Sequence, residues 1–340
     1  SNVSVFGNDA TGVGGIEIDN CNESNFWNNT VLCNNVGIFI AESHTNSIFS
    51  NNVSSIYLIG LSISSCYNNS FFDNVVSCYG PYEVYTLQSF NNSLFDNSFL
   101  GNGSDVMNYN STDFWDNGVE GNYWIKYKGV DTNLDGTGDT PFVIDTTNQD
   151  NHPLMGLFQS YNTSLNRNVD IVSNSSIDNF EYFEPNSTIM LQVSNMTADQ
   201  TIGFCRISIP HSLINPYNGS ISVVIDNGQT PVLFLNNTLY DDGTNRWIYF
   251  TYQQSTHSIS VVRIVAEFPV FVIIALFMIG TAIVTATWRK KPRGLGTYNG
   301  VSSGVQSAAR ARLRFMLVPA GPEIEMDNAR AMVPRLCGLP

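Results

Sequence analysis

The sequence predicts an all-β protein: a right-handed parallel β-helix, followed by an antiparallel β-sandwich and then by one C-terminal transmembrane helix. Three observations carry this prediction. A short phrase recurs about every 22–23 residues, a later region holds short alternating strands, and an uncharged apolar run lies near the C-terminus. A repeat of roughly 20–50 residues is typical of solenoids, because each repeat buries its apolar face against its neighbours.

The repeated phrase occupies residues 1–120, which we predict to be the coils of the β-helix. Its copies are NFWNN at 25–29, SIFSN at 47–51, SFFDN at 70–74, SLFDN at 93–97 and the looser DFWDN at 113–117. The steps between copies are 22, 23, 23 and 20 residues, counted along the markers Phe26, Ile48, Phe71, Leu94 and Phe114. Each coil holds about three short alternating stretches with Asn, Ser and Gly corners, which is a strand pattern. Because Ser1 falls within a coil-like phrase, we expect further coils and a secretion signal upstream.

The residue after each marker faces the opposite side of its strand, because side chains alternate along a strand. Aromatic residues stand there and are candidates for stacking against glycans: Trp27, Phe49, Phe72, Phe95 and Trp115. Whichever of the two faces points inward forms the core. The corner asparagines, such as Asn51 and Asn74, predict a structural ladder of stacked side chains.

The turns of the later coils carry three carboxylates at one phase: Asp73, Asp96 and Asp116. Glycoside hydrolysis needs two carboxyl groups about 5–9.5 Å apart, which stacked coils would supply. The same phase also holds Asn28 and Ser50, as expected of a solvated corner. Residues 1–120 contain no Lys or Arg, so a lyase base is lacking there and nucleic-acid binding is not expected.

Four cysteines keep the same register, as the like-phase pairs Cys21 with Cys66 and Cys33 with Cys78. Members of a pair lie two coils apart, about 10 Å at ~4.8 Å per coil, which is too far for a disulfide. We interpret them as buried structural thiols, with a metal site as the alternative.

Residues 121–158 form a predicted capping segment with an Asp-rich loop. Oxygen ligands alternate around Gly136, an arrangement that suits a hard cation such as Ca²⁺: Asp131, Asn133, Asp135, the Thr137 backbone and Asp139. This matches the first nine positions of an EF-hand-type loop. The twelfth position is Phe142 and not the bidentate Glu, so Asp145 or Asp150 would complete the shell. We expect structural calcium here; the alternative is an Asp/Gly turn held by Asx hydrogen bonds.

The coils and this ending together resemble the NosD-like β-helix family over roughly 13–158. The residues that carry the resemblance are Asn122, Tyr123, Trp124, Tyr127, Gly129, Asp131, Asn133, Asp135, Gly136, Gly138, Asp139, Thr140, Pro141, Pro153, Leu154 and Met155. The resemblance implies a secreted parallel β-helix related to carbohydrate-binding and sugar-hydrolase solenoids. The family takes its name from a periplasmic copper accessory protein, and the architecture resembles archaeal surface proteins.

Between residues 165 and 265 the period disappears, and we predict an antiparallel β-sandwich. Short strands recur every eight to twelve residues, with the turn signals Asn218-Gly219, Asn227-Gly228 and Asp242-Gly243 between them. Regular short strands with such turns are typical of a sandwich. This domain resembles the membrane-proximal sandwiches of archaeal surface proteins.

A transmembrane helix is predicted at 269–288, because Val270–Trp288 is apolar and uncharged over nineteen residues. A basic cluster follows it at once: Arg289, Lys290, Lys291 and Arg293. The positive-inside rule places residues 289–340 in the cytoplasm, as a basic and disordered tail. All fourteen glycosylation sequons lie before the span, and the charge is −20 before it and +6 after it. Both distributions agree with an extracellular N-terminal bulk.

We therefore expect a membrane-anchored extracellular surface protein that is non-catalytic and serves a structural or carbohydrate-binding role. Its expected partners are the membrane and cell-surface glycans or surface-layer proteins. One alternative is a polysaccharide hydrolase that uses the stacked carboxylates. A second is a copper-handling protein, which we do not expect because the histidines are scattered and the methionines isolated: His44, His152, His211, His257, Met107 and Met155.

Overall fold

A computed structural model describes residues 3–102, 104–215, 220–228 and 233–264. Within these ranges the regular structure is strands and short 3₁₀ turns, η1 (Glu184–Asn186) and η3 (Asp226–Gly228) among them. No helix in this part of the chain is long and apolar enough to cross a membrane. The predicted transmembrane helix at 269–288 and the tail at 289–340 lie outside the described residues.

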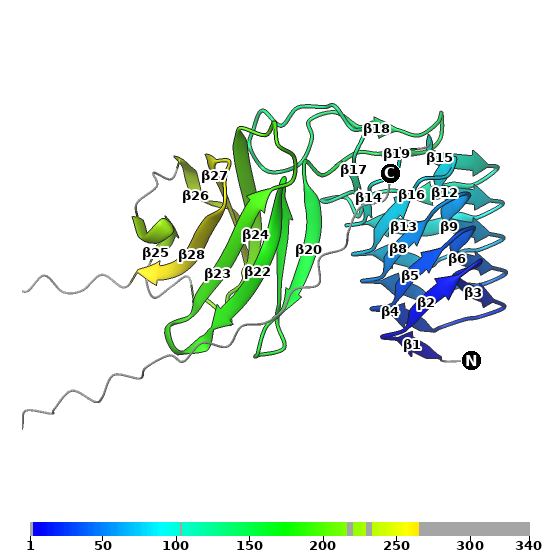
Figure 1. Ribbon diagram of the computed structural model, residues 1–340, viewed down its shortest axis with the longest axis horizontal. Helices are drawn as coiled ribbons and strands as arrows, with labels where there is room; N and C mark the ends of the chain where they lie inside the picture. Colours follow the sequence, from blue (N-terminus) through cyan, green and yellow to red (C-terminus); the bar gives the residue numbers. More distant parts are fainter. Residues whose placement is uncertain (1–2, 103, 216–219, 229–232, 265–340) are drawn as a thin grey trace, which may run out of the picture. The chain divides into compact units, whose positions relative to one another are not determined.

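The N-terminal part is a parallel β-solenoid, as predicted, and its three sheets run along the stack of coils (Figure 1). Sheet A contains β1 (Ser4–Phe6), β4 (Asn25–Trp27), β7 (Ser47–Phe49), β10 (Ser70–Phe72), β13 (Phe90–Phe95) and β16 (Thr112–Phe114). Sheet B contains β2 (Asp9–Gly12), β5 (Thr30–Cys33), β8 (Asn52–Ser55), β11 (Val75–Cys78), β14 (Ser98–Phe99) and β17 (Tyr123–Trp124). Sheet C contains β3 (Ile16–Asp19), β6 (Val36–Ala41), β9 (Ile59–Ser64), β12 (Tyr82–Leu87) and β15 (Ser104–Tyr109).

The markers of the first four copies form one interior row. Phe26 pairs with Ile48, Ile48 with Phe71 and Phe71 with Leu94, and all four side chains are buried. The fifth copy is shifted by one residue, because Ser93 pairs with Phe114. Trp115 therefore continues the interior row with 1% exposure, whereas Phe114 faces outward.

Two buried asparagine ladders tie the coils together. In the longer one each side-chain amide donates to the next amide oxygen at 2.9 Å, through Asn29, Asn51, Asn74, Asn97 and Asn122. The shorter ladder runs through Asn46, Asn69, Asn92 and Asp113. The longer ladder also ends at a carboxylate, that of Asp150. A terminal Asn would have amide donors with no further rung to accept them, whereas a carboxylate only accepts.

After a short capping segment with sheet D, β18 (Phe142–Val143) and β19 (Gln149–Asp150), the chain forms two antiparallel sheets that fit a sandwich. Sheet E has the order β20 (Leu157–Asn162), β21 (Asn168–Ser173), β24 (Ile202–Pro210), β27 (Asn245–Gln253) and β26 (Leu233–Asp241). Sheet F has the order β22 (Ser175–Phe183), β23 (Thr188–Asn195), β28 (His257–Ile264) and β25 (Ser220–Ile225). Both contribute to one apolar core, which includes Ile171, Ile207 and Ile248 of sheet E and Leu191 and Ile259 of sheet F.

The other face of sheet E meets the capping segment. Phe158, Val172, Phe204 and Tyr249 of sheet E form a cluster with the buried Leu154 of the cap. Strand alternation explains this arrangement, because Val172 and Ile171 are neighbours in β21 and point to opposite faces. This second face carries the polar side chains of the site.

Candidate functional site

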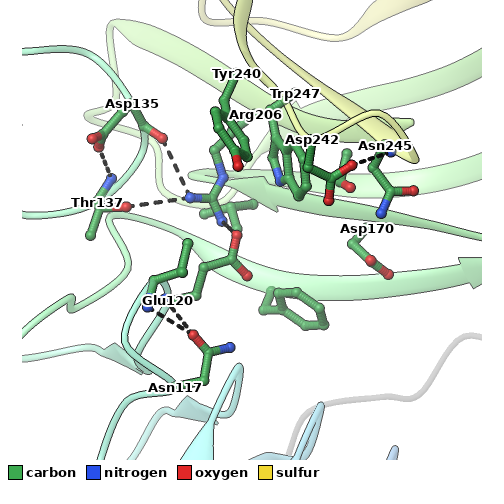
Figure 2. Close-up of a pocket in the computed structure, with 14 residues that line it drawn as sticks. Asn117, Glu120, Asp135, Thr137, Asp170, Arg206, Tyr240, Asp242, Asn245 and Trp247 are labelled. Atoms are coloured by element: carbon green, nitrogen blue, oxygen red, sulfur yellow. Dashed lines mark hydrogen bonds and ion pairs between the residues drawn. The ribbon is translucent and has the colours of Figure 1, made fainter. Parts of the chain in front are cut away.

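A pocket of about 530 Å³ lies where the outer face of sheet E meets the turn after β16 and the Asp-rich loop (Figure 2). One cross-strand row forms part of its wall, since Asp170 of β21 pairs with Ser208, Ser208 with Trp247, and Trp247 with Tyr240. Residues at this register lie on one face of the sheet. The hairpin between β26 and β27 adds Asp242 and Asn245, and the turn after β16 adds Asn117 and Glu120.

Tyr240 and Trp247 form the aromatic part of the pocket. Their ring centroids lie 5.3 Å apart and the planes are tilted by 43°. Tyr240 is 60% exposed. No described residue is a hydrogen-bond partner of the Tyr240 hydroxyl or of Trp247 Nε1. An aromatic face with a free polar edge suits a ligand that has both an apolar face and hydroxyl groups.

Among the described residues that line the pocket Arg206 is the single base, and its guanidinium is bonded to three other residues. Its Nη2 lies 2.7 Å from Glu120 Oε1, with both side chains at most 15% exposed. Its Nη1 donates to the Asp135 carbonyl at 3.4 Å and to Thr137 Oγ1 at 3.3 Å. Arg206 of the sandwich thus joins the turn after β16 to the Asp-rich loop, as the dashed lines in Figure 2 show.

The pKa values of the pocket carboxyl groups are shifted in different directions. Burial raises the pKa of Asp170 above its ordinary value and the Glu120 carboxylate adds to this, while the Ser160 hydroxyl and Arg206 oppose it. The backbone amides of Asn245 and Thr244 hold the pKa of the exposed Asp242 below its usual range. Asp242 therefore stays ionised at neutral pH.

Two of the proposed catalytic carboxylates lie on the flank of the solenoid next to this site. Burial raises the pKa of Asp73 to about 6, although the Ser50 hydroxyl donates to its Oδ2 at 2.6 Å. Burial also raises the pKa of Asp96 well above its ordinary value, and the hydrogen-bonded Glu120 carboxyl raises it further. The use of Asp73 together with Asp96 or Asp116 as a catalytic couple stays a prediction.

Asp116, the third proposed carboxylate, does not share the phase of Asp73 and Asp96. Because Ser93 pairs with Phe114, the fifth coil is shifted by one residue and Asp116 leaves the register that Asp73 and Asp96 share. The Asp116 carboxylate instead accepts hydrogen bonds from the amide groups of Asn151.

Four of the proposed glycan-stacking residues form a ladder on the outer face of sheet A. Phe6, Trp27, Phe49, Phe72 and Phe95 stack in order, with centroids 4.6–5.9 Å apart and planes within 10° of parallel. Each ring covers the face of its neighbour. The rings in the middle of the ladder therefore present only their edges to a ligand. Trp115, the fifth candidate, does not belong to this ladder because it is buried in the core.

The residues of the predicted calcium loop form a hydrogen-bonded turn. Asp131 accepts from the backbone amides of Asp135 and Gly136, and Asp135 accepts from Thr137 N and Asn133 Nδ2. The Asp139 carboxylate instead accepts hydrogen bonds from the backbone amide and the hydroxyl of Thr132. The loop thus gathers Asp131, Asn133, Asp135 and Thr137 and directs Asp139 elsewhere. Calcium binding remains a prediction.

The described cysteines are free thiols. Cys33, Cys66, Cys78 and Cys205 are buried and free, and Cys21 is free and half-buried. Burial raises the pKa of the Cys66 thiol to about 11. Within the residues that the structure describes, no group of three or more His, Cys, Asp or Glu side chains is arranged to hold a metal ion.

Comparison with known proteins agrees with the class of protein that the fold defines, a parallel β-solenoid followed by a sandwich. Residues 1–129 match the model of a family described as "Periplasmic copper-binding protein (NosD)". The N-terminal domain is therefore a NosD-like parallel β-helix. Searches of curated proteins and of solved structures each gave no match.

Proposed function

We propose that this chain is an extracytoplasmic surface protein that binds carbohydrate without cleaving it, and that the pocket on sheet E is its binding site. The observation that carries the proposal is the pair of the exposed Tyr240 and the half-buried Trp247, which lines the pocket together with amide and carboxylate side chains. Sugars present C–H faces that pack on aromatic rings and hydroxyl groups that bond to such polar groups.

The solenoid and the cap serve as the rigid support of this site. The coils fix Asn117 and Glu120, and the buried ion pair between Glu120 and Arg206 connects them to the sheet that carries Trp247. The periplasmic setting in the family description supports an extracytoplasmic location. Anchoring by the apolar run at 269–288 belongs to the same proposal.

The test is retention of the chain on a panel of soluble and insoluble polysaccharides, together with an assay for new reducing ends. We expect retention on at least one polysaccharide without new reducing ends. The variant Tyr240→Ala/Trp247→Ala should lose retention. The control Tyr57→Ala, which removes a 65% exposed aromatic ring from the solenoid, should not. Retention that survives the pocket variant would refute the site, and new reducing ends would refute the non-catalytic role.

A further inference from the structure

We propose that the pocket selects carbohydrates that carry a protonated amine, so that its ligand is an amino sugar. This inference rests on the proposed function and specifies its ligand. Four observations support it: the charge of the lining, the engagement of Arg206, two carboxylate oxygens without donors, and the position of the aromatic pair.

The lining is acidic. It contains Glu120, Asp135, Asp170 and Asp242 against one base, Arg206. The neighbouring coils add no base, because residues 1–120 lack Lys and Arg. A pocket lined by one sign of charge concentrates ligands of the opposite sign.

The positive charge of Arg206 is paired within the protein and is not available to a ligand. Its guanidinium is paired with Glu120 at 2.7 Å and also donates to Asp135 O and Thr137 Oγ1. Its donors are therefore directed at the turn after β16 and at the Asp-rich loop. An anionic sugar would find no free cation among the residues that line the pocket, whereas a cationic one meets Asp170 and Asp242.

Each of these two carboxylates keeps one oxygen available. Asp242 Oδ1 accepts from the backbone amides of Thr244 and Asn245 at 2.7 Å, and Asp170 Oδ1 accepts from the Ser160 hydroxyl at 2.6 Å. Among the described residues, no donor reaches Oδ2 of either carboxylate. An ammonium group has three donors and forms charge-assisted hydrogen bonds with such oxygens.

On the pocket wall, the aromatic pair lies between Asp170 and Asp242. Asp170 and Tyr240 stand at opposite ends of one cross-strand row that passes through Trp247, and Asp242 follows Tyr240 by two residues. Figure 2 shows Asp170, Trp247, Tyr240 and Asp242 lining the same pocket. A cation over the face of Trp or Tyr is attracted by the ring as well as by the carboxylates. A sugar ring on the aromatic pair would thus bring its amine to carboxylate oxygens.

The experiment is isothermal titration of the full chain with the glucosamine tetramer and with its N-acetylated counterpart, at low and high salt. Acetylation removes the positive charge and keeps the ring stereochemistry. We expect the amine form to bind at least about tenfold more tightly at low salt, and the preference to shrink as salt screens the charges. Asp242→Asn should abolish most of the preference for the amine form. Adding Asp170→Asn to this variant should reduce the preference further. Asp178→Asn, which removes an exposed carboxylate on β22, is the matched control and should leave the preference intact.

Equal or tighter binding of the acetylated tetramer, lost in Tyr240→Ala/Trp247→Ala, would overturn the amine preference and leave the proposed function standing. Spermidine binding at the same site with equal affinity would overturn the assignment to a sugar. Asp242 is exposed in a hairpin, so the folding of its variant is not in question, and circular dichroism of the Asp170 variant checks the partly buried position.

Discussion

Glu83 is a buried acid inside the solenoid, and its protonation is expected to control the stability of the chain. It stands in β12 at the register of Gly60 and Gly37, where a Cβ would lie 2.3 Å and 2.2 Å from valine side chains of sheet B. The Glu83 side chain is fully buried. Its Oε1 accepts from the Gly101 amide, and none of the described residues is a hydrogen-bond partner of its Oε2. Burial raises the pKa of Glu83 to about 8; the Gly101 amide and Lys126 oppose the rise, and Asp105 adds to it.

The direction of the pH dependence follows from this pKa. The ordinary value is 4.5, so between pH 4.5 and about 8 the folded chain holds a proton that the unfolded chain releases. Stability from this group is fully present below pH 4.5 and is lost as the pH rises to about 8. The free energy of unfolding is expected to fall by about 1.4 kcal/mol per pH unit, or about 5 kcal/mol in all.

The perturbation that tests this is Glu83→Gln, which keeps the shape and removes the titration. Urea unfolding of both proteins at pH 5, 7 and 9 measures the effect. The variant should match the native chain within about 2 kcal/mol at pH 5, since one amide donor is left unsatisfied, and exceed it at pH 9. Other buried acids such as Asp150 titrate in both proteins, so only the difference between them reports Glu83. Glu17→Gln, on the exposed edge of the solenoid, is the control. A difference that stays constant from pH 5 to pH 9 would refute the reasoning.

Three further predictions concern other parts of the chain. Asn74→Ala interrupts the long ladder and leaves the buried backbone amide of Asn51 without its acceptor, so it should destabilise the chain by about 1–3 kcal/mol in urea unfolding; equal loss in the exposed Asn179→Ala would contradict this. Arg206→Met leaves Glu120 buried and unpaired and should cost about 3–5 kcal/mol, most of which Glu120→Gln in the same chain should restore, as melting curves would show. The melting temperature of the native chain should be higher in calcium than in chelator, and that of Asp131→Ala/Asp135→Ala should be the same in both. The same calcium effect in both proteins would contradict a calcium site in this loop.

The solenoid can be predicted from the sequence because each coil repeats the same short pattern of residues, and this local pattern determines the register. The fifth coil shows the limit of that signal. Phe114 and Trp115 are both aromatic, so either satisfies the interior position, and a slip of one residue exchanges the two faces. Pairing of Ser93 with Phe114 decides between them, and it moves Trp115 into the core and Asp116 out of phase.

The pocket was harder to predict because its residues meet only through tertiary contacts. Glu120 and Arg206 are 86 residues apart, and Trp247 comes from a strand further on. One local signal was present: Arg206 interrupts the otherwise apolar and small residues of Ile202–Pro210. A charge in the middle of a buried strand indicates a partner across the fold. The change from Asn to Asp at Asp113 likewise marks the end of its ladder.

The most direct test of amino-sugar binding in the pocket is a crystal structure of the chain with a bound glucosamine oligosaccharide. We expect a sugar ring against Tyr240 and Trp247, with its amine within hydrogen-bonding distance of Oδ2 of Asp170 or Asp242. A sugar bound instead along the ladder of Trp27, Phe49, Phe72 and Phe95, with the pocket empty, would contradict it.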